Sequence, residues 1–557
     1  MDFSRVLVAA FVLATLGLSG CATNPMRSYD SELKQTGNDL ASNNAAKALA
    51  DHEAANSGKF SGEKDLLYFL EKGNLLRFNN QLPESRDAWL KADEKVRVWE
   101  EEAKTSPEKI LSYIGTAVVN DKMLRYDGQD FEKVMLSTNL ALDHILLGNW
   151  DMARTEIKKM HEREAIIADI RAKEIEKIEE EAKSRNVKTE IKELKGYPVE
   201  TLNDPEVTKL KNSYQSAFSH YLAGFVYEAL NEPSLAAPGY RKAVELRPGI
   251  KILEDGLKNL DKRTGSRAGK AGLTDVLFVV ESGSAPARKS VSIPIPGVIP
   301  GQGAASGAAQ GAVLGASLGA LLGSNPSADS GKPAATTASS ATENAVAGAV
   351  LGSLLGGGQS LTVVPISFPI IESAKFTPPT SLTLDNGSKV GLSSVTNIDA
   401  MSRRALKDDM PGIILRGTIR AITKTVAQNQ AQKHGGGLLG AAVSIAAIAT
   451  ESADERGWRT LPADISIARV QLPAGKHSVD IAGKKLDIEV DGRYLVYPIR
   501  LAGPTAYAAQ PVMQKLAYLT DSVAEKAEPG PTDQPTKKTR NLKKKALAGK
   551  KTPPAVQ

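Results

Sequence analysis

The sequence GFVYEALNEPSLAAPGYRKAVELRP, residues 224–248, decides the fold of the N-terminal half of the chain. Small residues occur at Gly224 and 12 positions later at Ala236, and the large Tyr240 follows one helical turn after Ala236. Small side chains on two neighbouring helices let the backbones approach closely, and a large side chain fills the groove beside the contact. We therefore predict two antiparallel helices here, with Ala243 on the same inner face and an end at Pro248.

The same spacing occurs twice more upstream. The two further sets are Gly73, Ser85, Trp89 and Ala92, then Ala141, Ala153, Ile157 and Met160. With Tyr227 and Pro248 also in place, these segments resemble the tetratricopeptide (TPR) pattern. The resemblance implies a degenerate TPR-like superhelix over residues 61–262 with a concave groove for a protein partner. It assigns packing or groove roles to Trp89, His144, His220, Tyr227 and Tyr240. The alternative is an unrelated helical bundle.

Two features interrupt this helical region. Residues 162–195 are about half charged, with isoleucines at helical spacing. This pattern predicts a long solvated helix or helical hairpin that projects from the domain and ends at Tyr197-Pro198. Upstream, a turn at Tyr126–Gln129 leads into a helix with Asp130 as the expected N-cap and Glu132 in its first turn. The alternative for Asp127, Asp130 and Glu132 is a ligand or cation site.

The hydrophobic period changes after Leu273. Strands are expected at 276–281, 291–295, 361–371, 382–384 and 390–395, and a helix at 410–432 carries Arg416, Arg420 and Lys424 on one face. Residues 458–501 alternate again, with turns at Pro473–Gly475 and Asp491-Gly492. We predict an α+β multidomain protein, in which residues 273–505 form a small antiparallel β domain.

A glycine-rich insertion at residues 301–358 interrupts this β domain. Glycines recur every fourth residue at Gly303, Gly307, Gly311, Gly315, Gly319 and Gly323, and again at Gly348, Gly352 and Gly356. Each glycine costs a helix about 1 kcal/mol, so such a ladder needs close helix packing. It resembles the glycine-zipper segments of outer-membrane lipoproteins. We expect a helical hairpin that inserts into membrane or self-associates; the alternatives are a flexible linker and packing within the domain.

The chain has one cysteine, Cys21, directly after Leu18-Ser19-Gly20 and an apolar run of about a dozen residues that begins at Val6. This arrangement resembles a bacterial lipobox. The resemblance implies that residues 1–20 are a signal peptide and that Cys21 is lipidated. Residues 21–60 are polar and rich in Asn, Ala, Ser and Lys, so we expect them to tether the first domain to the membrane, with some helix near 31–56. Ala22 after the cysteine implies sorting to the outer membrane.

The net charge of +6 belongs to the C-terminal tail. Residues 537–551 carry eight positive and no negative charges, so the rest of the mature chain sums to −2. We expect residues 524–557 to be disordered and able to contact an anionic polymer; the alternative is a tail that only aids solubility. No nucleic-acid-binding domain is indicated. No cofactor, metal-ligand spacing or catalytic motif in a suitable context is present, so we expect no enzyme.

The combination of lipobox, helical repeats, glycine-rich insertion and the motifs YDGQDFEKV (126–134) and WRTLPADISIARVQLPAGKH (458–477) resembles a family of TPR-containing envelope lipoproteins of Gram-negative bacteria. The resemblance implies an envelope location and carries no known active site. With the TPR-like groove, it leads us to expect a lipid-anchored outer-membrane scaffold that faces the periplasm and binds another envelope protein. By analogy with TPR-bearing outer-membrane lipoproteins that activate cell-wall synthases, such a scaffold would regulate cell-wall or envelope assembly. The alternative function is a membrane-active or oligomeric assembly or secretion factor that works through the glycine ladders.

Overall fold

A computed structural model describes residues 29–57, 63–114, 124–194, 196–264, 272–296, 363–373, 376–449 and 453–511. All of them belong to one compact unit, residues 1–514. Cys21, both glycine ladders and the basic tail lie outside the described residues. The larger helices before residue 265 are α2 (Tyr29–Ala41), α3 (Ala45–Ala55), α4 (Leu66–Phe78), α5 (Leu82–Thr105), α7 (Asp130–Leu146), α8 (Trp150–Ser184), α10 (Ala217–Ala229), α11 (Pro233–Leu246), α12 (Lys251–Lys258) and α13 (Leu260–Thr264).

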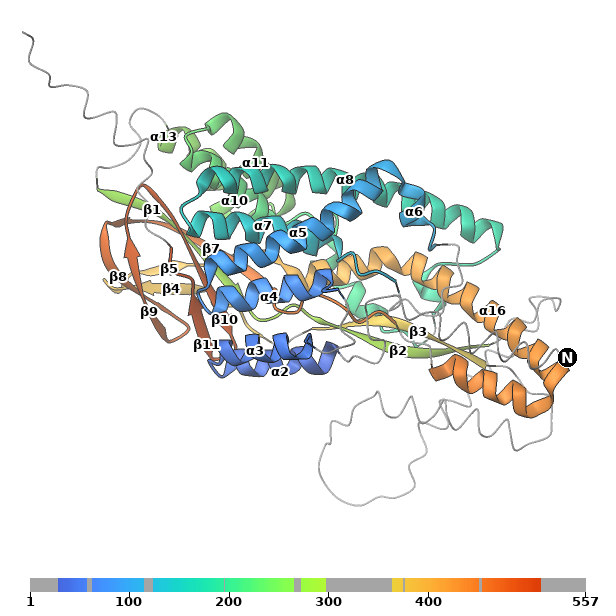
Figure 1. Cartoon of the computed structure of the whole chain (residues 1–557). Coiled ribbons are helices and arrows are strands. Elements are labelled where there is room, and N and C mark those ends of the chain that lie inside the picture. Colours follow the sequence, from blue (N-terminus) through green and yellow to red (C-terminus); the bar gives the residue numbers. More distant parts are fainter. Residues whose placement is uncertain are drawn as a thin grey trace, which may run out of the picture. The chain divides into compact units, whose positions relative to one another are not determined.

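The three predicted helix pairs are confirmed as the hairpins α4–α5, α7–α8 and α10–α11 (Figure 1). Their turns contain Asn80, Gly148 and Asn231, each in the left-handed region that reverses the chain after a helix. Between α10 and α11 the closest approach is made by Gly239, where an added Cβ would lie 2.8 Å from the Gly224 amide nitrogen. The predicted Ala236 is also fully buried.

Helix α8 differs from its prediction. It ends at Ser184 rather than near Tyr197, and it does not project into solvent, because helix α16 (Ile398–Ala449) packs on its C-terminal half. Ile178 of α8 is buried against Leu415 and Ile419 of α16. The alternating charges therefore mark the exposed sides of a helix that is covered along one face.

Hairpin α2–α3 lies in the region that was predicted to be a tether. The Asn79 amide at the end of α4 donates to the Ala45 carbonyl, 3.0 Å away. Near the C-terminal end of the described chain, the Tyr507 hydroxyl donates to the Leu40 carbonyl at 2.7 Å. Residues 29–57 thus pack against α4 and against the segment around Tyr507.

The β part, predicted as a small antiparallel β domain, forms three sheets whose strand pairs are antiparallel except for β1–β10. The strands are β1 (Leu273–Ser282), β2 (Ala287–Pro296), β3 (Val363–Glu372), β4 (Ser381–Leu384), β5 (Lys389–Gly391), β6 (Ser393–Asn397), β7 (Asp464–Pro473), β8 (Gly475–Ile481), β9 (Lys484–Val490), β10 (Tyr494–Ala502) and β11 (Thr505–Ala508). The largest sheet has the order β11-β10-β1-β7-β6, and its β1–β10 pair is parallel. The order β5-β4-β8-β9 makes a second sheet, and β2 pairs with β3.

The five-stranded sheet lies between helices and the four-stranded sheet. Even-numbered β1 residues, such as Phe278, share a core with Leu382 and Val479 of the four-stranded sheet. Odd-numbered residues face the helices, as shown by the ion pair of Glu281 with Arg77 of α4 at 2.9 Å. This alternation is the expected period of two along a strand.

The β2–β3 ribbon packs along α16. Ile366 and Phe368 of β3 are buried with Leu406 and Met410 of the helix. The predicted helix at 410–432 is part of α16, and Arg416 and Arg420 of its predicted basic face are buried. The ribbon remains paired up to Pro296 and Val363, where residues 297–362 begin and end. No helix in the described part of the chain is both long and apolar enough to span a bilayer.

Candidate binding site

The inner face of the helical hairpins is occupied by the protein's own loop before β7. In this loop Trp458 is 1% exposed and packs edge-on against Trp89 of α5, with ring centroids 6.1 Å apart. Glu132 accepts the Trp458 amide at 2.7 Å, and Glu71 accepts the Arg459 amide at 2.6 Å. A concave surface filled in this way offers no groove to a partner while the loop stays in place.

The five residues to which the TPR resemblance gave packing or groove roles are all buried. None of them is more than 6% exposed: Trp89, His144, His220, Tyr227 and Tyr240. Trp89 lies over Gly73, and Tyr240 lies over Gly224, as the spacing predicts. Of the two predicted roles, packing is therefore the one that their burial permits in this structure.

The two groove histidines lie in different surroundings. Burial, with a smaller contribution from Arg86 and Lys159, lowers the pKa of His144 to about 4, so this ring is neutral near pH 7. His220 stacks on His161, with centroids 5.3 Å apart, and its Nε2 lies 3.2 Å from Glu164. Across the described ranges, no group of three or more His, Cys, Asp or Glu side chains is arranged to hold a metal ion.

The carboxylates at the start of α7 each have separate partners. Gln129, not Asp130, is the N-cap, and Glu132 accepts its amide at 2.9 Å. Asp130 pairs with Lys133 at 2.9 Å and with Arg171 at 2.5 Å; although burial acts against it, these cations lower the pKa of Asp130 to about 2. Asp127 pairs with Arg125. The three side chains thus serve the helix start and its ion pairs.

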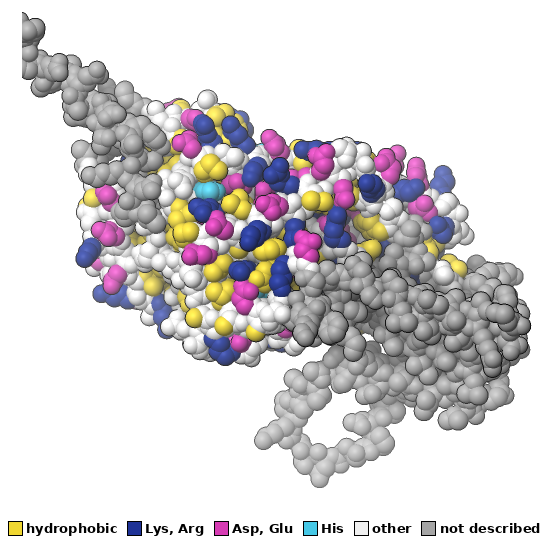
Figure 2. Space-filling view, in the orientation of Figure 1, with side chains coloured by type: hydrophobic (Ala, Val, Ile, Leu, Met, Phe, Trp, Pro, Cys, Tyr) yellow, Lys and Arg dark blue, Asp and Glu magenta, His cyan; other side chains and the backbone are white. Residues whose placement is uncertain are grey.

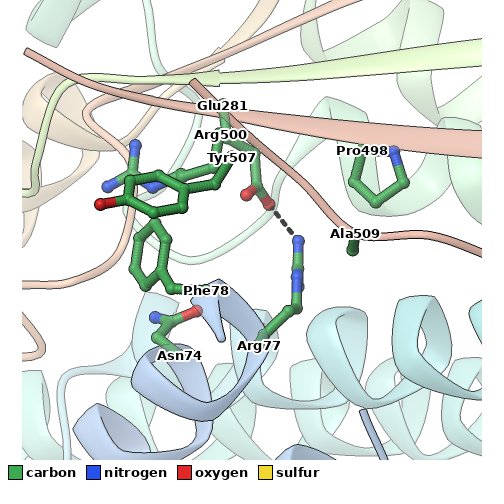
Figure 3. A pocket seen from close by; sticks show the side chains of 8 residues that line it. All are labelled: Asn74, Arg77, Phe78, Glu281, Pro498, Arg500, Tyr507 and Ala509. Carbon is green, nitrogen blue, oxygen red and sulfur yellow. Dashed lines mark hydrogen bonds and ion pairs between the residues drawn. The ribbon is translucent and has the colours of Figure 1, made fainter. Parts of the chain in front are cut away.

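A small polar cavity lies between α4 and the sheet (Figure 3). Arg77 donates to Glu281 there, while Phe78 and Tyr507 pack edge to face at 5.1 Å. Burial lowers the pKa of the nearby Arg500 to about 10. Because this value is still well above 7, the guanidinium is charged at neutral pH. The cavity volume of about 20 Å³ is that of roughly one water molecule, so this is a structural polar cluster rather than a ligand site.

A larger groove opens at the edge of the five-stranded sheet, and we call it the β7 groove. It has a volume of about 390 Å³, within the roughly 300–1,000 Å³ range of small-ligand sites. The helical wall comes from α10, α12 and α13, and the opposite wall from β5, β6 and β7. Its lining residues include Tyr221, Lys251, Asp255, Arg263, Asp275, Gly391, Ser393, Arg469 and Gln471.

The charges in the floor of the β7 groove neutralise one another. Arg469 donates to Asp275 through two bonds of 2.8 Å and to Glu228 at 2.5 Å. Arg263 donates to Glu228 at 2.6 and 2.9 Å. Burial alone would raise the pKa of Glu228, but the two guanidinium groups outweigh it and lower this pKa. The floor is therefore a rigid network with balanced charge.

Tyr221 belongs to the wall of this groove as a packing residue. Its side chain is fully buried, and its ring packs edge-on against Tyr240 at 5.1 Å. Burial raises the pKa of the Tyr221 hydroxyl, and the adjacent Arg469 guanidinium acts against that rise. The hydroxyl is therefore part of the buried network around Arg469.

Sequence reasoning missed the β7 groove, although one signal for it was present. Arg469 follows Ile465 and Ile467 in the same phase of the strand, so a cation falls on the face that the isoleucines mark as buried. A buried cation requires an acidic partner, and Asp275 and Glu228 provide it. Elsewhere, Figure 2 shows Lys, Arg, Asp and Glu interspersed over the visible face, with no large area of one sign.

Comparison with known proteins adds little to this geometry. No protein-family model and no curated protein matches the chain. Among solved structures, the chain is similar to a tetratricopeptide repeat protein from Parabacteroides merdae, with 15% sequence identity and a TM-score of 0.13. That match covers 42% of this chain and 98% of the other, and the similarity is weak.

Proposed function

We propose that this protein is a non-catalytic scaffold of the Gram-negative envelope, lipid-anchored through Cys21 in the outer membrane and facing the periplasm, and that it binds another envelope protein. The observation that carries the binding role is the β7 groove, which lies beside the part of β7 that β6 leaves uncovered. The lipid anchor and the location rest on the lipobox-like residues 6–21.

The docking surface differs from the one that the TPR resemblance implies. Because Trp458 and the five-stranded sheet cover the inner face of the helices, we place the partner at the edge of the sheet. The helical hairpins then support one wall of the β7 groove instead of forming the binding surface. Control of cell-wall or envelope assembly is the role that such a scaffold would serve.

Photo-crosslinking in the protein's own host tests the binding role. A photoreactive residue at the exposed position Gln471 should give an adduct with an envelope protein. Gly391→Phe should abolish that adduct, because Gly391 lines the groove and has open space beyond its Cα. Gly37→Phe in α2 is the matched control, since its surroundings are equally open. An adduct unchanged by Gly391→Phe would overturn the proposed docking surface.

Fractionation of the same cells tests the anchor. Cys21→Ser removes the sulfur that would carry lipid, so the variant should leave the membrane fraction. If the variant remains in the outer-membrane fraction, lipid at Cys21 does not anchor the protein.

A further inference from the structure

We propose that the β7 groove binds an extended polypeptide segment of the partner, which adds as a strand beside Ala468–Leu472 of β7. This inference rests on the proposed function and names the form in which the partner binds. Strand addition is a recurrent mode of peptide recognition, in which main-chain hydrogen bonds supply much of the affinity.

The first observation is an open strand edge. Strand β7 pairs with β1 along its whole length, Asp464–Pro473. On its other edge, β6 covers only Asp464–Ile467, and no other strand in the described ranges pairs with β7 there. Antiparallel strands direct alternate backbone N–H and C=O groups to each side, so residues 468–472 present unpaired groups on this edge.

The second observation is that the chain's own β6 already occupies the first part of this edge. Thr396 of β6 accepts the Phe218 amide of α10 at 3.0 Å, so a strand fits between the helices and β7. Upstream of Ser393 the chain leaves the edge, because Leu392 donates to Thr380 in the four-stranded sheet at 2.8 Å. The β7 groove begins at Ser393, where β6 leaves the edge, and runs beside the uncovered part of β7.

The third observation concerns charge. Arg469 and Arg263 are paired with Asp275 and Glu228, and Lys251 pairs with Asp255 at the rim. A strongly charged ligand would have to break these pairs, which is costly for buried ions. A peptide main chain is neutral and carries both donors and acceptors, so it suits a groove whose charges are already balanced.

The test uses the full lipidated chain in detergent and a phage-displayed library of random linear heptapeptides as the probe. A selected peptide should bind wild type and Gly37→Phe alike, and Gly391→Phe about tenfold more weakly or not at all.

The sharpest readout is N-methylation of the selected peptide, one residue at a time. Strand addition predicts losses of about tenfold at every second residue and little effect between them. Uniform tolerance of N-methylation, selection of no peptide, or equal binding by Gly391→Phe would each overturn the strand model.

Failure of this inference is distinguishable from failure of the proposed function. If the in-cell adduct at Gln471 persists and is sensitive to Gly391→Phe while peptides fail, the partner binds as a folded surface, a second copy of this chain or a glycan. The proposed groove then stands and the strand model falls. If both assays fail, the groove is not a binding site.

Discussion

Adding one methyl group to Gly73 should destabilise the protein, whereas the same change at Gly37 should stabilise it. Both glycines lie inside helices, α4 and α2, so helix propensity favours alanine at each by about 1 kcal/mol. At Gly37 nothing lies within 4 Å of the new Cβ. At Gly73 the new Cβ would lie 2.1 Å from Nε1 and 2.3 Å from Cδ1 of Trp89.

The Trp89 ring has no room to move away. Trp89 is fully buried, its Nε1 donates to the Leu70 carbonyl at 3.1 Å, and Trp458 packs on the ring. Overpacking of this kind costs about 1–3 kcal/mol, and the contact distance places Gly73→Ala near the upper end. After the propensity gain is subtracted, we expect a net loss of about 2 kcal/mol, against a gain of roughly 0.5–1 kcal/mol for Gly37→Ala.

Urea denaturation of the two variants and wild type, followed by tryptophan fluorescence, measures both values. A second comparison, Gly73→Ala in a Trp89→Phe background, should show coupling of more than about 1 kcal/mol, because the smaller ring relieves the clash. If Gly73→Ala and Gly37→Ala change the free energy of unfolding equally, the close contact between α4 and α5 is wrong, and so is the small-residue reasoning behind all three hairpins.

Three further changes test other parts of the structure. Trp458→Ala should lower the free energy of unfolding by about 3–5 kcal/mol, while Val98→Ala on the exposed side of α5 should change it by less than about 0.5 kcal/mol. Burial raises the pKa of Asp143 from 3.8 to about 7, so wild-type stability falls as pH rises from about 4 and levels off above pH 7. Asp143→Asn should therefore match wild type at pH 4 and exceed it by about 4 kcal/mol at pH 8, as measured by denaturation at the two pH values. Replacing residues 297–362 by a short Asn-Gly turn should leave the circular dichroism melting temperature within a few degrees of wild type, since Pro296 and Val363 are already paired; a collapse in thermal stability would show that the insertion supports the ribbon.

The helical hairpins were predictable because their determinants are local. Gly224, Gly239 and Tyr240 lie within 17 residues of one another, so their spacing alone encodes the contact. The β7 strand itself could be predicted for the same reason, since the period of two is a property of a single strand. That Asp464–Ala468 are buried on both faces could not, because it depends on what packs on each side of the sheet. The helix ends were predicted less accurately. The N-cap of α7 is Gln129, where Asp130 was expected.

The sheet order and the β7 groove could not be predicted in the same way. Strand β1 pairs in parallel with β10, which begins more than 200 residues later, and no local pattern encodes that choice. The groove depends on Glu228, Arg263, Asp275 and Arg469 meeting from four elements. The position of the loop on the inner face of the helices could not be predicted either. The sequence around Trp458 indicates a buried aromatic residue but not the helix against which it packs.

Because β1 lies at the centre of the sheet, the time at which it can pair depends on how long the ribosome takes to synthesise its neighbours. Both neighbours of β1 lie far downstream, and β10 is complete only at Ala502, 220 residues after Ser282. At about 5–20 residues per second, roughly 10–45 s pass before the ribosome has supplied the last partner of this strand. The hairpins can form during that interval, but their apolar inner faces stay uncovered until the loop at Trp458 arrives. A chaperone that shields Trp89 and Phe225 during those seconds should therefore raise the yield of folded protein more than one that acts after synthesis is complete.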